Sequence, residues 1–246
     1  MREKECDIST YGDLIVEIGR LFLNKPYQAG TLEGFGKEKL IVNVSAFDCT
    51  TFVETVLALA RCTIAGKFSN SEFRKHLKSI RYCNGKMNGY ASRLHYFTDW
   101  LFDNERKKIV TDVSRSLGGK PLRKKINFIT AHRELYPALG NKKQLAKMAT
   151  AERNLSRRTF HIIGKDQVRA QKEKLENGDI IAFATHQEGL DIAHVGFAVR
   201  KGKNLHLLHA SKKEGAVVIS KSTIQAYLKS NKTLTGIIVA RFFQRY

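Results

Sequence analysis

The sequence has no long apolar run and comparatively few acidic residues. None of its apolar stretches approaches the roughly 18 residues that a membrane-spanning helix needs, so we expect no membrane span. Its 246 residues include 23 Asp and Glu against 43 Lys and Arg, which gives a formal charge of +20. Such an excess attracts polyanions of any kind. The basic residues are scattered and form no recognisable nucleic-acid-binding module, so no specific nucleic-acid partner is expected. A solvated basic surface explains them equally well.

Cysteine is also scarce, and its spacing excludes common cysteine-rich sites. The four cysteines (Cys6, Cys49, Cys62 and Cys83) form no CxxC pair and no zinc-finger spacing. We therefore expect no metal site, no cofactor and no disulfide framework. Cys62 and Cys83 lie among apolar residues, which predicts inert buried thiols. Residues 1–10 lack an apolar signal core, so the protein is either cytosolic or exported by a signal that precedes this sequence.

Helical patterns occupy the first third of the chain, and strand patterns occupy the last third. Apolar spacing predicts helices over 11–24, from 48 or 49 to 65, and over 69–80, with a short strand or extended segment at 40–47. Short alternating runs separated by turn residues predict antiparallel strands at 177–185, 191–200, 204–211, 215–220 and 235–243, with a short helix at 222–230. This order predicts an α+β fold in which the second helix packs on a small antiparallel sheet.

The middle of the chain, residues 81–175, is dominated by two helical patterns, at 90–104 and 141–158. Because no linker or repeat separates it from its flanks, we interpret it as a large helical insertion within one elaborated domain covering residues 1–246. Arg93, Tyr96 and Trp100 share one face of the first predicted helix. They are candidate substrate contacts or, as an alternative, a packing stripe.

Cys49 begins the second predicted helix, with Asp48 before it as a candidate N-cap. Apolar residues follow it at the spacing of one helix face, which directs the thiol toward the sheet: Phe52, Val53, Val56, Leu57 and Ala60. A thiol in the first helical turn is near the positive end of the helix dipole, which predicts a lowered pKa. The Asp48 charge opposes that effect. An isolated cysteine is also common as a small core residue.

Two histidines on neighbouring predicted strands are candidate partners for this thiol. Strand alternation places His194 on a face of small residues, with room for a partner and a substrate. His209 ends the next strand and can orient the first imidazole, as the third member of a catalytic triad does. A nucleophilic thiol needs such a base and such an orienting group. The alternative for either histidine is a satisfied core residue.

The same residues carry a family resemblance. The segments KPYQAG with Tyr27, FDCTTFVE with Asp48 and Cys49, AHVGFAV with His194, and HAS with His209 follow in that order. This arrangement resembles the NlpC-type cell-wall cysteine peptidases, a papain-like superfamily. The blocks YASRLHYFTDW and NFITAHRELYPAL further resemble its N-acetylmuramoyl-L-alanine amidase-like branch.

The resemblance implies a papain-like fold and acyl transfer on an amide bond of bacterial peptidoglycan. It assigns Cys49 as nucleophile, His194 as base and His209 as orienting residue, and it implies Tyr27 and Asp48 at the substrate. The alternative for Tyr27 is a packing residue at a turn. Arg93 and Tyr96 are further candidate substrate contacts. Peptidoglycan or its fragments would be the partner, the protein would be a monomer, and its location would be periplasmic or secreted. The bond could be the muramoyl–L-alanine amide or one within the stem peptide.

Two other functions stay open. A non-catalytic module that binds glycan or another polyanion would use the basic surface alone. A glycoside hydrolase would need two carboxylates flanking the scissile bond, and the sparse acidic residues show no such pair.

Overall fold

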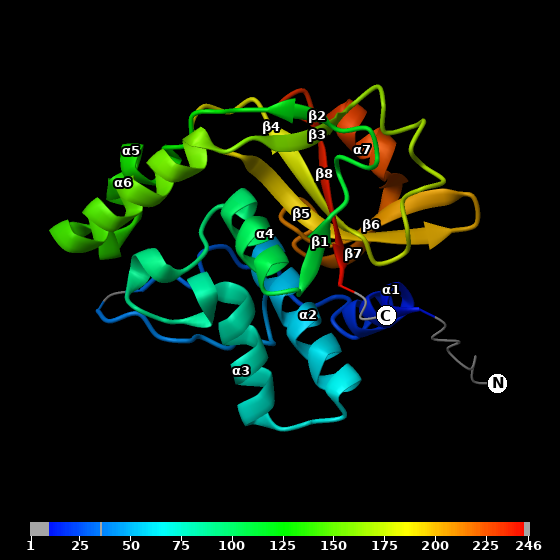
Figure 1. Cartoon of the computed structure of the whole chain (residues 1–246). Coiled ribbons are helices and arrows are strands. Elements are labelled where there is room, and N and C mark those ends of the chain that lie inside the picture. The colour runs from blue at the N-terminus through cyan, green and yellow to red at the C-terminus, as the bar shows by residue number, and fades with distance from the viewer. Residues whose placement is uncertain (1–9, 35, 244–246) are drawn as a thin grey trace.

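The protein, a computed structural model, is described over residues 10–34 and 36–243. Seven α-helices and eight β-strands occur among these residues (Figure 1). The helices are α1 (Tyr11–Arg20), α2 (Cys49–Ala65), α3 (Asn70–Arg81), α4 (Phe97–Arg106), α5 (Phe128–Ala131), α6 (Lys142–Arg157) and α7 (Ile224–Ser230). The strands are β1 (Val110–Asp112), β2 (Lys120–Leu122), β3 (Phe160–Gly164), β4 (Ile180–Thr185), β5 (Ile192–Lys201), β6 (Asn204–Ser211), β7 (Ala216–Thr223) and β8 (Leu234–Phe242). No helix of the described residues is long and apolar enough to cross a membrane.

All eight strands belong to one sheet, and every strand pair in it is antiparallel. The order is β2-β3-β8-β4-β5-β6-β7, and β1 pairs with β8 beside this path. Strands β4 to β7 form successive hairpin neighbours. The last strand, β8, returns to the centre of the sheet and lies between β3 and β4. The chain therefore folds as a mixed α/β structure on an antiparallel sheet.

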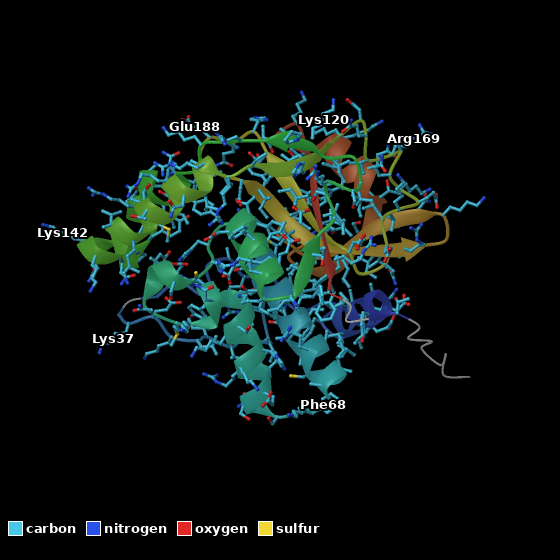
Figure 2. All side chains as sticks on the ribbon, in the orientation of Figure 1. Lys37, Phe68, Lys120, Lys142, Arg169 and Glu188 are labelled. Carbon is cyan, nitrogen blue, oxygen red and sulfur yellow. The ribbon has the colours of Figure 1, made fainter. Side chains whose placement is uncertain are left out.

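Both faces of the sheet are covered. Strand alternation directs Val195, Phe197 and Val199 into one core, which they share with α1 and α2. Ala198 and the neighbouring Ile181 and Phe183 face the other way, into a second core closed by α7. In Figure 1, α1 to α4 lie on one side of the sheet and α7 lies on the other. Figure 2 shows the side chains that fill the space between these layers.

Helix α2 begins and ends where the sequence predicts. The Asp48 carboxylate accepts a hydrogen bond from the Thr51 amide at 2.7 Å, and the Thr51 hydroxyl accepts one from the Asp48 amide at 3.0 Å. This capping box satisfies two backbone donors at the helix start. At the other end Gly66 adopts φ 62°, a left-handed conformation that glycine reaches without steric cost. Local capping therefore sets the position of Cys49 at the helix N-terminus.

The middle segment differs from its prediction. Residues 81–175 hold α4, α5 and α6, but they also supply β1, β2 and β3, so this segment is not purely helical and the sheet is larger than expected. Helix α4 begins only at Phe97, so Arg93 and Tyr96 do not share a helical face with Trp100. Residues 40–47 form no strand but contribute one isolated bridge, between Phe47 and Tyr27.

Candidate active site

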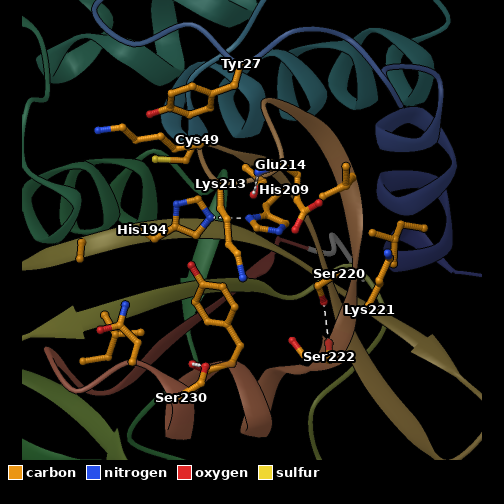
Figure 3. A pocket seen from close by; sticks show the side chains of 18 of the residues that line it. Tyr27, Cys49, His194, His209, Lys213, Glu214, Ser220, Lys221, Ser222 and Ser230 are labelled. Atoms are coloured by element: carbon orange, nitrogen blue, oxygen red, sulfur yellow. Dashed lines mark hydrogen bonds between the residues drawn. The ribbon is translucent and has the colours of Figure 1, made fainter.

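A cavity of about 1070 Å³ contains the three residues that the sequence singles out for catalysis. Cys49 enters it from the start of α2, His194 from β5 and His209 from β6 (Figure 3). The rest of its wall comes from Tyr27, the β6–β7 turn, β7, and α7 with the residues after it. Ligand sites are usually concave spaces of several hundred cubic ångströms, so this one can hold a substrate of considerable size.

The two imidazoles are in direct contact. Nε2 of His194 lies 2.6 Å from Nδ1 of His209, and the ring planes are nearly perpendicular at 78°. Nε2 of His194 makes this contact, and Nδ1 is the other nitrogen of the same ring. Figure 3 shows the Cys49 sulfur beside the His194 imidazole. His209 is only 3% exposed, whereas His194 is half-buried. The geometry is that of a base held in place by a buried second imidazole.

Burial keeps both imidazoles neutral. It lowers the pKa of His194 to about 3, with a smaller contribution from the neighbouring His209, and it lowers the pKa of His209 to about 4. At neutral pH, the His194 tautomer that donates its Nε2–H to Nδ1 of His209 has a free lone pair on its own Nδ1 and can accept a proton there.

The Cys49 thiol does not have the lowered pKa that the helix dipole predicts. Burial first, and then the charge of Asp48, raise its pKa to about 11. Hydrogen bonds from the Val195 amide, the Thr50 hydroxyl and its own amide act in the opposite direction but are weaker. The predicted direction is therefore wrong, because desolvation outweighs the helix N-terminus. At rest the site holds a neutral thiol and neutral imidazoles.

Two tyrosines flank the thiol. Burial raises the pKa of Tyr27, and Cys49 and Asp48 add to this rise through their charges. Burial also raises the pKa of Tyr227, again with a contribution from Cys49. The ring of Tyr227 lies about 6 Å from each imidazole, with centroid distances of 6.1 Å to His194 and 6.0 Å to His209. Both hydroxyl groups are therefore neutral donors at the cavity.

Sequence reasoning predicted Tyr27 but missed Tyr227. Tyr227 lies on α7, where Ile224 and Leu228 are the buried residues, and its ring packs against Phe183 at a centroid distance of 4.8 Å, with the ring planes tilted by 50°. The helical spacing of α7 could have indicated that a residue three positions after Ile224 faces the sheet. Nothing local indicates that this face lies over the two histidines.

The other predicted substrate contacts have structural partners. Asp48 serves as the N-cap of α2. Arg93 is buried and pairs with Glu33 at 2.9 Å, and it also donates to the Leu32 carbonyl at 2.7 Å. The buried Tyr96 hydroxyl donates to Glu152 at 2.7 Å and accepts from the Ile129 amide. None of these three residues lines the cavity. Asp48 is next to Cys49 and acts on its thiol through charge, whereas Arg93 and Tyr96 are not brought together with Cys49.

The remaining cysteines are not alike. Cys62 is buried, as predicted, but Cys83 is exposed in the short turn that follows α3, so the prediction of a buried thiol is wrong there. Cys6 lies outside the described residues. Over the residues that the structure describes, no group of three or more His, Cys, Asp or Glu side chains is placed to hold a metal ion.

Comparison with known proteins identifies the family. Residues 17–237 match the family described as AmiA-like, N-acetylmuramoyl-L-alanine amidase-like. The chain belongs to this family. No curated protein matches the sequence.

Several solved structures resemble this amidase-like chain along almost its whole length. One is named an N-acetylmuramoyl-L-alanine amidase from Bacteroides uniformis. It is 38% identical, with 95% of this chain and 99% of that one covered and a TM-score of 0.90. Another is named a "putative xylanase" from Bacteroides fragilis, with 40% identity, 92% and 99% coverage, and a TM-score of 0.84. A protein from Legionella pneumophila shares the fold at 23% identity, with 97% and 91% coverage and a TM-score of 0.71.

Proposed function

We propose that the protein is a cysteine amidase that hydrolyses the amide between N-acetylmuramic acid and L-alanine in bacterial peptidoglycan. The observation that carries the proposal is the convergence of Cys49, His194 and His209 on one cavity, with the two imidazoles 2.6 Å apart. Membership of the amidase-like family supports the choice of bond, as does a relative named for that activity. Cleavage inside the stem peptide is the alternative within the same chemistry.

The proposed reaction begins with attack of the Cys49 sulfur on the amide carbonyl. His194 accepts the thiol proton as the sulfur–carbon bond forms, and it then passes that proton to the leaving nitrogen as the carbon–nitrogen bond breaks. Water next attacks the thioester, with His194 again as base, and this releases the carboxylic acid and restores the thiol. His209 holds the His194 ring throughout.

Neutral resting groups require the first proton transfer to accompany the attack. A thiol pKa near 11 and an imidazole pKa near 3 make a resting thiolate–imidazolium pair unfavourable. The developing oxyanion would be held by the Cys49 backbone N–H and the neutral Tyr27 hydroxyl. Tyr27 and Cys49 both line the cavity, and the Cys49 amide forms a hydrogen bond to its own sulfur.

This mechanism is the one that the NlpC-type, papain-like resemblance implies, and we infer that superfamily for the chain. We also infer that residues 1–246 form one elaborated domain, with 81–175 as an insertion, that the protein acts as a monomer, and that it works outside the cytoplasmic membrane, where its substrate lies. The antiparallel sheet covered by α2 supports this assignment.

A glycoside hydrolase is the second candidate, because one relative is named a xylanase. That chemistry requires two carboxylates at roughly 5–10 Å from each other across the scissile bond. Among the described residues that line the cavity, Glu214 is the one carboxylate. The thiol and two imidazoles therefore favour amide chemistry.

The test is digestion of purified peptidoglycan, followed by mass spectrometry and by assays of free amino groups and of reducing ends. The proposed reaction should give new L-alanine amino termini and no new reducing ends. The variant Cys49→Ser should release neither the peptide with a free L-alanine amino terminus nor the glycan with a free muramic carboxylate. Cys83→Ser is the matched control and should keep full activity. New reducing ends would establish the second candidate, and a release of peptides without L-alanine termini would move the cleavage into the stem.

A further inference from the structure

The cavity extends well beyond the catalytic residues, and the extension is basic. Its far wall is formed by the β6–β7 turn, by β7 and by the residues that follow α7. Lysines occur along all three: Lys212 and Lys213 in the turn, Lys221 on β7, and Lys232 after α7. A single carboxylate, that of Glu214, lines the same space among the described residues.

These four lysines have no carboxylate partner within the part of the chain that the structure describes. Other basic residues that border buried regions are paired, such as Arg81 with Glu54 and Arg241 with Asp179. Unpaired ammonium groups around one concave space raise the positive potential inside it. The protein walls have a low dielectric constant, so they focus the field into the cavity instead of screening it as water would.

Hydroxyl groups accompany the lysines. Ser222 and Ser230 are exposed and line the wall, while Ser220 is already bonded to the Leu207 amide at 2.9 Å and to the Ser222 carbonyl at 2.7 Å. In Figure 3 the Lys213 side chain crosses in front of the histidine pair, and Lys221 lies farther along β7. The basic groups therefore line the same cavity as the reacting sulfur.

We propose that this extension, lined by Lys213, Lys221 and Lys232, is a carboxylate-binding subsite that selects the acidic peptide portion of the substrate. The inference rests on the proposed function, since it names which part of a peptidoglycan fragment occupies this side of the cavity. In the muramoyl–L-alanine linkage the muramic carboxyl is consumed by the amide, so the free carboxylates of the substrate belong to its peptide. The peptide, which is the leaving group, therefore lies along β7.

The experiment compares two soluble muropeptides that differ only in their peptide carboxylates, which are free in one and converted to carboxamides in the other. Steady-state kinetics are measured for the wild-type protein, for the double variant K213Q/K221Q, and for a charge-matched control, K142Q/K143Q. Lys142 and Lys143 lie at the start of α6, are exposed, and do not line this cavity. Figure 2 labels Lys142 at the edge of the molecule. Thermal melting checks that each variant is folded.

The wild-type protein should prefer the free-carboxylate substrate by about tenfold in kcat/KM, which corresponds to two partly exposed charge pairs. The preference should reside in KM, because these contacts are present before and during the reaction, and it should weaken as salt is added. K213Q/K221Q should lose the preference, and K142Q/K143Q should keep it.

Each contrary outcome has a separate meaning. If the wild-type protein hydrolyses both substrates with equal kcat/KM, the subsite is refuted while the amidase activity stands. If K142Q/K143Q loses the preference as fully as K213Q/K221Q does, overall surface charge explains it and the subsite is again refuted. If neither substrate is hydrolysed, the proposed amidase function itself fails, and the subsite fails with it.

Discussion

Replacing Asp48 by Asn should lower the pKa of the Cys49 thiol without displacing the helix that carries it. The Asp48 charge is the second largest cause of the raised pKa of about 11, after burial. Asn is as good an N-cap as Asp, so the hydrogen bond to the Thr51 amide can persist. The substitution therefore removes a charge and retains a cap.

The size of the change follows from Coulomb's law. A unit charge at roughly 6 Å, in a medium with an effective dielectric constant of about 40, contributes about 1.4 kcal/mol, or about one pKa unit. At pH 8 the thiolate fraction should rise about tenfold. Because a thiolate of lower pKa is also a weaker nucleophile, the alkylation rate should rise only about threefold.

The assay is the rate of alkylation by iodoacetamide between pH 7 and pH 11, measured by mass spectrometry on the peptide that contains Cys49. Asp48→Ala is the informative companion variant. It should give the same pKa shift but cost about 1 kcal/mol of stability through the lost cap. An unchanged or higher thiol pKa in Asp48→Asn would refute the electrostatic account of the site.

Three further predictions concern the histidine pair and the buried charges. His209→Ala should lower kcat by about 10²-fold or more with little change in KM, because the His194 ring loses the partner that orients it; steady-state kinetics and unchanged iodoacetamide labelling at Cys49 check this. As the pH falls, kcat/KM should stay constant down to about pH 4 and then decrease, because burial lowers the pKa of His194 to about 3 and of His209 to about 4. A decline centred near pH 6.5 would contradict a buried neutral base. Glu54→Gln should cost about 3–5 kcal/mol in urea unfolding, because it leaves Arg81 buried without its partner at 2.6 Å. Glu17→Gln, at a partly exposed pair, should change stability by less than about 1 kcal/mol.

Helix α2 shows what the sequence could predict. Its bounds depend on local interactions: an Asp N-cap, apolar residues at helical spacing and a terminal glycine. The long strands β4 to β8 have similarly clear alternation and turns, so they too were predicted. Since Cys49, His194 and His209 lie on these regular elements, the candidate site could be assembled from the sequence.

Strands β1 and β2 could not be predicted in the same way, because each is only three residues long. Strand β1 forms by pairing with β8, and β2 forms by pairing with β3. Both partners are distant in sequence, so no local pattern indicates either pairing. Lys124 is a similar case. Its ammonium donates to the carbonyls of Thr185, Gln187 and Leu190 at 2.6–2.7 Å and so ties the middle segment to the turn before β5. Only the assembled fold brings these groups together.

The predicted direction of the Cys49 pKa shift was wrong for a related reason. Helix position can be inferred from sequence, but desolvation depends on what covers the thiol. Tyr27 comes from the loop before α2, Val195 from β5 and Tyr227 from α7. The same holds for the basic wall of the cavity. Its lysines looked like part of a scattered surface charge until the fold placed them around one space.

The most direct test of the central claim is the mass of the enzyme during turnover of a muropeptide, with acid quenching on the millisecond scale and peptide mapping. Nucleophilic catalysis by Cys49 predicts a transient thioester on this residue whose added mass equals the muramic acid glycan less one water, together with a burst of the peptide amine. A burst of amine with unmodified Cys49, or an adduct on a different residue, would contradict nucleophilic catalysis by this thiol.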